Sequence, residues 1–145
     1  MPLMESLLNV YGVMPGGLNK WEQAFARWLD KQPDRVIWWL RNVPRPNALN
    51  DWGVRIELPE SRTGFYPDFV VCVHGRKAGM LLAETKERMH SEDTEAKSRT
   101  EHAAYGRALM LAWEEEQARF LRYEFDFGMG RNVPRGKLEP EHLVD

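Results

Sequence analysis

The sequence predicts an α/β (α+β) fold in which one mixed central sheet is flanked by helices. Two patterns predict it: apolar and polar residues alternate in several short segments, and apolar residues recur at helical spacing in others. The 145 residues fit a single domain, 1–145, with a core at about 18–127. Hydrophobic residues make up 43% and charged residues 29%, which is typical of a folded chain rather than a disordered one.

The first predicted element is a helix that begins near Asn19 and ends before Pro33. Asn19 is a favourable N-cap residue. Apolar residues follow it at helical spacing: Trp21, Ala24, Phe25, Trp28 and Leu29. Proline has no backbone N–H and cannot continue a helix, so Pro33 ends this one.

Four strands are predicted next. Residues 36–42 (VIWWLRN) are bulky and rich in strand-forming types, and residues 54–58 alternate between apolar and charged. Residues 65–73 form the third strand, with Pro67 indicating a start or an irregular edge there. Residues 80–86 form the fourth, after a connection at 74–79 that contains two glycines.

The second half of the chain predicts one long helix and one strand. An alanine-rich stretch capped by Ser91 or Asp93 predicts a helix to about Arg119, with Gly106 marking a close approach or a break. Residues 120–127 alternate clearly and predict a strand. Residues 128–145 are rich in glycine, proline and charge, and predict a loose tail.

Composition and charge bear on the partners and the cellular location expected of the chain. The net charge of −2 does not by itself indicate a nucleic-acid partner, although carboxylates gathered at a metal site would offset basic residues elsewhere. No apolar run approaches the roughly 20 residues that cross a bilayer, so no membrane partner is expected. The N-terminus lacks the basic segment of a signal peptide, and Cys72 is the single cysteine. A cytoplasmic protein without an internal disulfide is therefore expected.

Three charged residues predict a metal site. Asp68 interrupts an apolar strand, and Glu84 and Lys86, two residues apart on the next strand, project to the same face. If the two strands pair as a hairpin, Asp68 reaches the same patch. Two converging carboxylates repel each other and lose hydration, and a divalent cation relieves both costs. Oxygen ligands in an incomplete shell suit Mg²⁺.

Such a site has the chemistry for cleaving a phosphodiester. A bound metal ion polarises a phosphoryl oxygen and lowers the pKa of its bound water. Lys86 can orient that water or stabilise negative charge on the phosphate.

At these residues the chain resembles the PD-(D/E)xK nuclease superfamily. The motifs that carry the resemblance are residues 66–71 (YPDFVV) and 83–86 (AETK). More narrowly, the chain resembles, over about residues 10–127, the endonuclease domain at the C-terminus of type III restriction subunits and related DEAD/DEAH-type helicases. One departure is the lack of a G-x-x-x-x-G-K-[ST] loop, so the chain is expected to be either a stand-alone relative or an excised domain.

The resemblance implies a fold, a reaction and a site. The fold is a restriction-endonuclease-like core in the order α-β-β-β-α-β, and the predicted strand at 36–42 is one strand more than that core has. The reaction is hydrolysis of DNA phosphodiester bonds by an endonuclease that uses Mg²⁺, with Mn²⁺ as a substitute. The implied catalytic residues are Asp68, Glu84, Lys86 and Glu22, and the implied metal ligands are Asp68, Glu84, Glu22 and the backbone carbonyl of Thr85. The implied partners are DNA or RNA, a helicase or translocase partner or parent chain, and a second copy in a homodimer.

Structural interpretations stand beside these functional ones. Asp68 and Glu84 can be strand-end residues, with Lys86 in an ordinary salt bridge. Glu22 lies three residues after Asn19, which is the spacing of a capping box. Lys97 is either half of a solvated pair with Asp93 or a second active-site cation. The same fold can also serve as a catalytically silent module that binds nucleic acid or a helicase, or as a purely structural domain.

Overall fold

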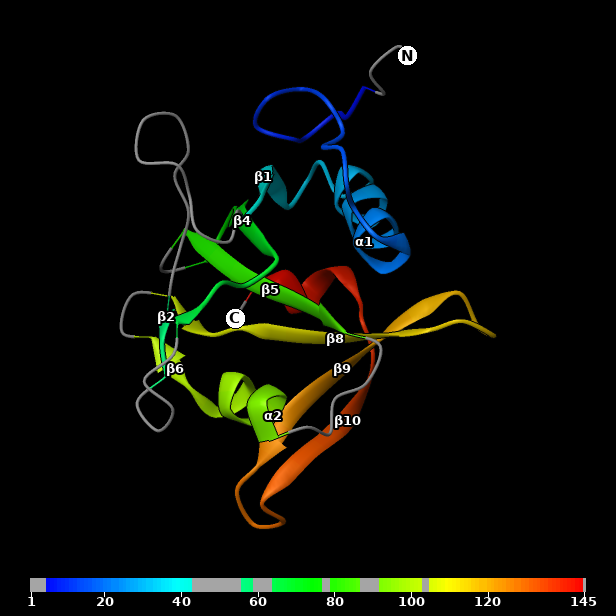
Figure 1. Cartoon of the computed structure of the whole chain (residues 1–145). Helices are drawn as coiled ribbons and strands as arrows, with labels where there is room; N and C mark the ends of the chain where they lie inside the picture. The colour runs from blue at the N-terminus through cyan, green and yellow to red at the C-terminus, as the bar shows by residue number, and fades with distance from the viewer. Residues whose placement is uncertain are drawn as a thin grey trace.

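A computed structural model describes residues 5–42, 56–58, 64–76, 79–86, 92–102 and 105–144, without the side chains of 56, 57, 92 and 93. Its centre is a six-stranded sheet in the order β1-β4-β5-β8-β9-β10 (Figure 1). These strands are β1 (Val36–Arg41), β4 (Phe69–Val73), β5 (Met80–Lys86), β8 (Leu109–Glu114), β9 (Arg119–Asp126) and β10 (Arg131–Lys137).

Two short strand pairs and three helical segments complete the described elements. The strand pairs are β2 (Ile56–Glu57) with β3 (Gly64–Phe65), and β6 (Glu101–His102) with β7 (Gly106–Arg107). The helices are α1 (Lys20–Asp30), α2 (Glu92–Arg99) and the 3-10 helix η1 (Pro140–Leu143). None of the described helices has the length and apolar character needed to cross a membrane.

Helix α1 forms as the sequence predicts. The Asn19 side chain accepts a hydrogen bond from the Glu22 backbone N–H at 2.8 Å, and the Glu22 side chain accepts one from the Asn19 N–H at 3.0 Å. This capping box pairs two N–H groups that the first helical turn leaves without partners. The helix buries Phe25, Ala26 and Leu29 against the sheet.

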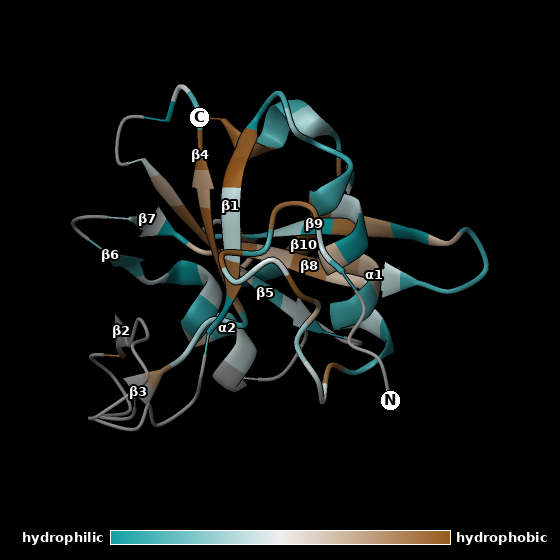
Figure 2. Ribbon diagram, turned by 90° about the horizontal axis from the view of Figure 1, so that it is seen from above, coloured by the Kyte–Doolittle hydropathy of each residue, from teal (hydrophilic) through white to brown (hydrophobic). Residues whose placement is uncertain are grey.

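The sheet separates two hydrophobic layers. One layer lies under α1 and η1 and includes Phe25, Leu29, Trp39, Phe69, Val71, Leu81, Ala83, Leu111, Phe120, Leu138 and Leu143. The other layer includes Leu40, Leu58, Phe65, Val70, Leu82, Ala108, Met110 and Ala112. Alternate residues of β4 and β5 enter opposite layers, so both strands are buried on both faces, and Figure 2 shows hydrophobic colour over β4 and much of β1.

The pairing directions of the strands decide which residues lie level with one another in the sheet. Strands β4 and β5 pair antiparallel with Phe69 opposite Ala83, so the preceding residue, Asp68, is level with Glu84. Strand β8 pairs parallel to β5, and helix α2 lies in the crossover between them, against β9. Strands β8, β9 and β10 then form an antiparallel meander.

Neither edge of the main sheet is a regular, open strand. At the β1 edge, Trp39 donates its N–H to the Leu8 carbonyl at 3.0 Å, and Val10 donates to the Trp39 carbonyl at 2.9 Å. At the other edge, β10 carries Pro134, and its register with β9 shifts between Pro134 and Gly136. Proline is tolerated at such a position because the outer side of an edge strand has no neighbour to receive an N–H.

The predicted long helix to about Arg119 is wrong. Helix α2 ends at Arg99, and residues 109–114 form β8 instead. Gly106 adopts a positive φ of 72°, which favours glycine and interrupts any helix there. Strand β8 has a neighbour on each side and side chains in both hydrophobic layers, so its sequence shows an apolar run rather than an alternation.

The predicted loose tail at 128–145 is also wrong. Residues 131–137 pair with β9 along its length, and η1 follows. Leu138 and Leu143 are 3% and 0% exposed and pack in the layer beneath α1. Strand pairing with β9 and these two leucines together hold a segment that is otherwise polar.

The remaining strand predictions hold in part. The predicted segment 65–73 is divided into β3 and β4 at residues 66–68, where Pro67 lies. Of the predicted strand 54–58, residues 54 and 55 lie outside the described residues, and residues 56–57 form β2, which pairs with β3 apart from the main sheet. The predicted strand at 36–42 forms β1, Val36–Arg41, in the main sheet. The mixed α/β sheet flanked by helices is confirmed at that level of detail.

Candidate active site

The β4–β5 hairpin brings Asp68 and Glu84 into direct contact. The Asp68 backbone N–H donates to Glu84 Oε1 at 3.1 Å. Thr85 donates its backbone N–H and its hydroxyl to Asp68 Oδ2, at 2.9 and 3.0 Å. One oxygen of each carboxylate is thus fixed by the backbone of the opposite strand, and Asp68 Oδ1 and Glu84 Oε2 are turned toward cationic side chains.

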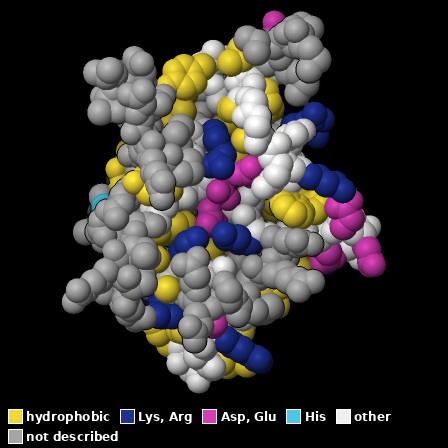
Figure 3. Space-filling model, in the orientation of Figure 1, with side chains coloured by type: hydrophobic (Ala, Val, Ile, Leu, Met, Phe, Trp, Pro, Cys, Tyr) yellow, Lys and Arg dark blue, Asp and Glu magenta, His cyan; other side chains and the backbone are white. Residues whose placement is uncertain are grey.

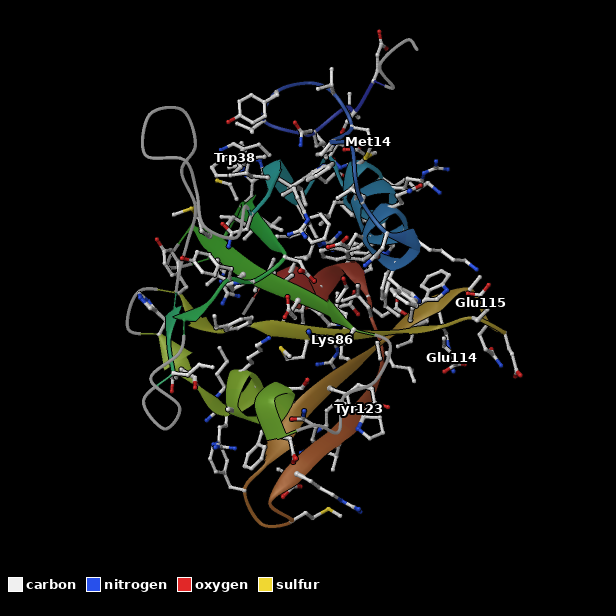
Figure 4. All side chains as sticks on the ribbon, in the orientation of Figure 1. Met14, Trp38, Lys86, Glu114, Glu115 and Tyr123 are labelled. Atoms are coloured by element: carbon white, nitrogen blue, oxygen red, sulfur yellow. The ribbon has the colours of Figure 1, made fainter. Side chains whose placement is uncertain are left out.

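Two lysines from different elements meet at the second oxygen of Glu84. The Nζ atoms of Lys86 and Lys97 lie 3.5 and 3.7 Å from Glu84 Oε2. Lys86 is the last residue of β5 (Figure 4), and its side chain is 34% exposed. Lys97 comes from α2, is 15% exposed, and also lies 5.1 Å from the centre of the Phe65 ring. The ammonium group nearer to solvent is therefore that of Lys86.

Arg41 links Glu22 to the site. Its Nη2 lies 2.8 Å from Glu22 Oε2, and its Nη1 lies 3.6 Å from Asp68 Oδ1. Nη1 also donates to the backbone carbonyls of Asp68 and Asn42, at 2.9 and 2.8 Å. The guanidinium bridges the end of β1, the start of β4 and the first turn of α1.

Acidic and basic side chains are equal in number at this site. Three carboxylates (Glu22, Asp68 and Glu84) are in contact with three cations (Arg41, Lys86 and Lys97). Figure 3 shows acidic side chains near the middle of one face, with Lys and Arg side chains on both sides of them. Opposite charges at this spacing stabilise the buried carboxylates, which would otherwise be costly.

Glu84 is the strongly perturbed acid of the site. Its pKa is raised from 4.5 to about 8, chiefly by burial and also by the neighbouring charge of Asp68 and a hydrogen bond with Asp68. Lys86 and Lys97 act the other way, toward a lower pKa, but do not cancel the effect of burial. The side chain is 4% exposed, so little water is available to stabilise its charge. In the absence of a bound cation, the raised pKa favours the protonated form of Glu84.

The donor set fits one hard divalent cation. Asp68 and Glu84 each have one oxygen directed toward positive charge, and Mg²⁺ takes one or two carboxylates and keeps several waters. Among the described residues, no cluster of three or more His, Cys, Asp or Glu side chains could hold a metal ion. The ligands that this geometry offers are therefore the two carboxylates of the hairpin.

The structure places each predicted site residue. Asp68, Glu84 and Lys86 converge as expected, and Thr85 joins them through its N–H and hydroxyl. Ligation of a metal by the Thr85 carbonyl stays a prediction. Glu22 forms the capping box and the ion pair with Arg41, so both of its oxygens have protein partners and the Arg41 guanidinium links it to Asp68. A role for Glu22 as a metal ligand stays a prediction that requires Arg41 to move.

Lys97 is the site residue that sequence reasoning underweighted. Its spacing from Asp93 indicated a solvated helix pair, and the Asp93 side chain lies outside the described part of the chain. The signal in its favour was its place on the first helix after the Glu84-Thr85-Lys86 motif, since the helix that leaves a motif strand often packs back across the strand end.

The comparisons with known proteins give no relative. No protein-family model, curated protein or solved structure matches this chain. A function for the chain rests on the residues and contacts described above.

Proposed function

We propose that this protein is a divalent-metal-dependent endonuclease of the PD-(D/E)xK type that hydrolyses phosphodiester bonds of DNA. The observation that carries the proposal is the pair of carboxylates, Asp68 and Glu84, held in contact at the same level of the β4–β5 hairpin, with Lys86 on the same strand end. The order of the α-helices and main-sheet strands up to β8, α1-β1-β4-β5-α2-β8, also supports it once the short pairs β2–β3 and β6–β7 are set aside, because it has the α-β-β-β-α-β sequence that the resemblance implies.

The protein's own groups have distinct tasks in this proposal. Asp68 and Glu84 would hold the metal ion, which when bound supplies a Lewis acid and a water of lowered pKa. The backbone N–H groups of Asp68 and Thr85 orient the two carboxylates before any ligand arrives. Lys86, partly open to solvent, is placed to orient the attacking water or to stabilise negative charge on the phosphate.

Lys97 and Arg41 act on these groups without binding the metal ion in this proposal. Lys97 lies beside the same Glu84 oxygen as Lys86, so it favours the ionised form of Glu84 that a metal ligand requires. Arg41 fixes the backbone at Asp68 through the Asp68 carbonyl. Neither residue has to touch the substrate for these effects.

A basic and aromatic cavity at the same end of the sheet supports a nucleic-acid substrate. Strand β8 passes Lys86 at Ala112, and the next residue, Trp113, lines a cavity of about 410 Å³. The cavity walls also include Trp28 and the basic residues Arg27, Lys31, Arg119 and Lys137. Cations that contact phosphates and an aromatic ring on which a base can stack are the usual features of single-strand binding surfaces.

The alternative is a binding module that uses the same fold without turnover. The observation that favours it is that each of the three acidic side chains already contacts a basic side chain in the absence of a metal ion. In this alternative, Asp68 and Glu84 fix the hairpin and the basic cavity alone binds nucleic acid.

A plasmid-nicking assay distinguishes the endonuclease from the binding module. The purified protein is incubated with supercoiled DNA in Mg²⁺, Mn²⁺ or EDTA, alongside the variants Asp68→Asn, Glu84→Gln and Lys86→Met. The expected result is metal-dependent nicking that falls by about 100-fold or more in each variant, as losses of single electrostatic groups in active sites do. Asp34→Asn, at an exposed position between α1 and β1 and outside both the site and the basic cavity, is the matched control and should nick normally. Nicking that persists in Asp68→Asn and Lys86→Met rejects the proposal, and DNA binding without nicking in either metal favours the binding module.

A further inference from the structure

The tip of the β9–β10 hairpin carries exposed apolar side chains. Strand β9 ends at Asp126 and β10 begins at Arg131, and the turn between them, residues 127–130, reads Phe-Gly-Met-Gly. Phe127 and Met129 are 62% and 55% exposed. Figure 1 shows the hairpin extending past α2 and ending in this turn. Two large apolar side chains gathered on one projecting turn point to a contact with another molecule.

The turn is held in one conformation by its own hydrogen bonds. Asp126 Oδ1 accepts hydrogen bonds from the N–H groups of Gly128 and Met129 at 2.9 and 3.0 Å, and the Gly130 N–H donates to the Asp126 carbonyl at 2.7 Å. Gly130 has a positive φ of 69°, which favours glycine, and a Cβ on Gly128 would lie 3.2 Å from Asp126 Oδ1. Little conformational entropy is therefore left to lose when a partner binds the tip.

Arginines flank the two apolar side chains. The Arg107 guanidinium lies 5.0 Å from the centre of the Phe127 ring, and the Arg99 guanidinium lies 5.4 Å from the centre of the Phe125 ring. The Phe125 and Phe127 rings meet edge to face, with centroids 5.0 Å apart. Arg107 and Arg131 are exposed, and neither side chain forms an ion pair or a hydrogen bond with another described residue. Stacking on a ring uses the face of a guanidinium and leaves its N–H groups available to an acceptor.

The hairpin is basic although the whole chain is not. Residues 119–137 contain five basic and two acidic residues, a formal charge of +3, whereas the chain carries −2. Both acids, Glu124 and Asp126, already contact Arg135, at 3.3 and 3.4 Å. An anionic partner complements this hairpin.

The tip lies on the same face of the sheet as the candidate active site. In the strand register, Glu84 is opposite Met110, and Met110 is opposite Tyr123, so the three side chains form one row on one face. Phe125 and Phe127 follow Tyr123 at intervals of two residues and share that face, as their ring contact requires. Two strand spacings and four residues along β9 separate Glu84 from Phe127, roughly 15–20 Å. One duplex can span that distance with about five base pairs.

We infer that the hairpin tip inserts Phe127 and Met129 into a groove of duplex DNA and partly unstacks a base step there. Phe and Met are among the apolar side chains that act as such wedges, and a kinked duplex then meets more of the protein surface. Arg107 and Arg131 are placed to contact the phosphates on either side of the wedge. The inference rests on the proposed function, because it makes duplex DNA the substrate of that endonuclease, but insertion can be measured without cleavage.

Binding of the whole protein to short duplexes in EDTA tests the inference. Each duplex carries 2-aminopurine at a different step, and the fluorescence of that base rises when it is unstacked. The unmodified protein should produce a rise. Phe127→Ala should remove most of the rise and weaken binding by about tenfold or more, and Met129→Ala should weaken binding by about threefold to tenfold. Ile37→Ala, an apolar position that is 45% exposed on β1 at the opposite edge of the main sheet, is the matched control and should bind normally.

The salt dependence of binding tests the arginines separately. Arg107→Gln and Arg131→Gln should each reduce the slope of log affinity against log salt concentration by about one, because each removes one phosphate contact.

Three outcomes would overturn the inference. The first is no rise in 2-aminopurine fluorescence with the unmodified protein. The second is a duplex affinity and a fluorescence signal that are unchanged in both Phe127→Ala and Met129→Ala. The third is binding to phosphatidylserine vesicles that depends on Phe127 while duplex affinity does not, which would assign the tip to a lipid surface.

Plasmid nicking measured on the same samples, in Mg²⁺, keeps this inference apart from the proposed function. A protein that does not nick but shows the Phe127-dependent fluorescence rise contradicts the endonuclease alone. A protein whose nicking, binding and fluorescence are all unchanged by Phe127→Ala and Met129→Ala contradicts the hairpin inference alone.

Discussion

Replacing Glu84 with glutamine is expected to remove a large pH dependence from the stability of this protein. Burial, together with the neighbouring Asp68, raises the pKa of the folded Glu84 to about 8, whereas its usual value is 4.5. Below pH 4.5 the folded and unfolded chains both hold the proton. Between pH 4.5 and 8 the unfolded chain loses it while the folded chain keeps it, so the free energy of unfolding falls as pH rises. Above pH 8 this contribution is constant.

The size of the effect follows from the pKa difference. Each unit corresponds to about 1.4 kcal/mol, so the fall between pH 4.5 and 8 is at most about 5 kcal/mol. That is comparable with the whole stability of a small domain, about 5–15 kcal/mol. Glutamine keeps an oxygen that can accept the hydrogen bond from the Asp68 N–H, and it does not ionise. Glu84→Gln should therefore resemble the unmodified protein near pH 5 and exceed it by several kcal/mol at pH 8.

Urea unfolding followed by tryptophan fluorescence measures the difference at a series of pH values from 5 to 8.5. Ionisation of the other groups contributes to both proteins, so the gap between the two stability curves isolates the Glu84–Asp68 pair. Glu114→Gln is the control, because Glu114 pairs with Arg119 at the hairpin end and is 29% exposed. Two parallel stability curves for Glu84→Gln and the unmodified protein would refute the account of a proton held by a buried carboxylate.

Three further outcomes are expected. Mn²⁺ at 100 times its Kd should stabilise the unmodified protein by about 3 kcal/mol in a thermal melt and leave Asp68→Asn unchanged. Calorimetry in two buffers at pH 7 should show that Mn²⁺ binding releases close to one proton, and the absence of release would contradict the protonated state of Glu84. Arg41→Met should lower the free energy of unfolding, measured with urea, by about 3 kcal/mol because Glu22, 7% exposed, loses its partner. The double variant that also carries Glu22→Gln should regain part of that free energy. Leu143→Ala should cost about 2–5 kcal/mol, whereas a loose tail would tolerate it.

The parts of the site that could be predicted from sequence are those set by local geometry. Side chains two residues apart on a strand share a face, so Glu84 and Lys86 could be placed together before the sheet was known. The short connection at 74–79 predicted the hairpin that brings Asp68 opposite. The N-cap at Asn19 fixed the start of α1 in the same way.

The parts that could not be predicted depend on distant neighbours. Residues 109–114 are apolar and follow an alanine-rich stretch, and such a run suits a helix as well as a strand until β5 and β9 are known to lie beside it. The segment 131–137 looked loose because its composition carries no information about the open edge of β9. Lys97 enters the site because α2 packs back across the sheet, and helix spacing alone does not give that direction.

The irregular edges of the main sheet have a consequence for assembly. A flat, unpaired edge strand invites another chain to add to it, which leads toward fibrils or unintended oligomers. Here the segment around Leu8 and Val10 occupies backbone groups of β1, and Pro134 with its register shift distorts β10. Continuation of the sheet from one molecule into the next is therefore disfavoured on both sides. If two copies come together to cut both strands of a duplex, they should meet through helices or loops and leave the sheets separate.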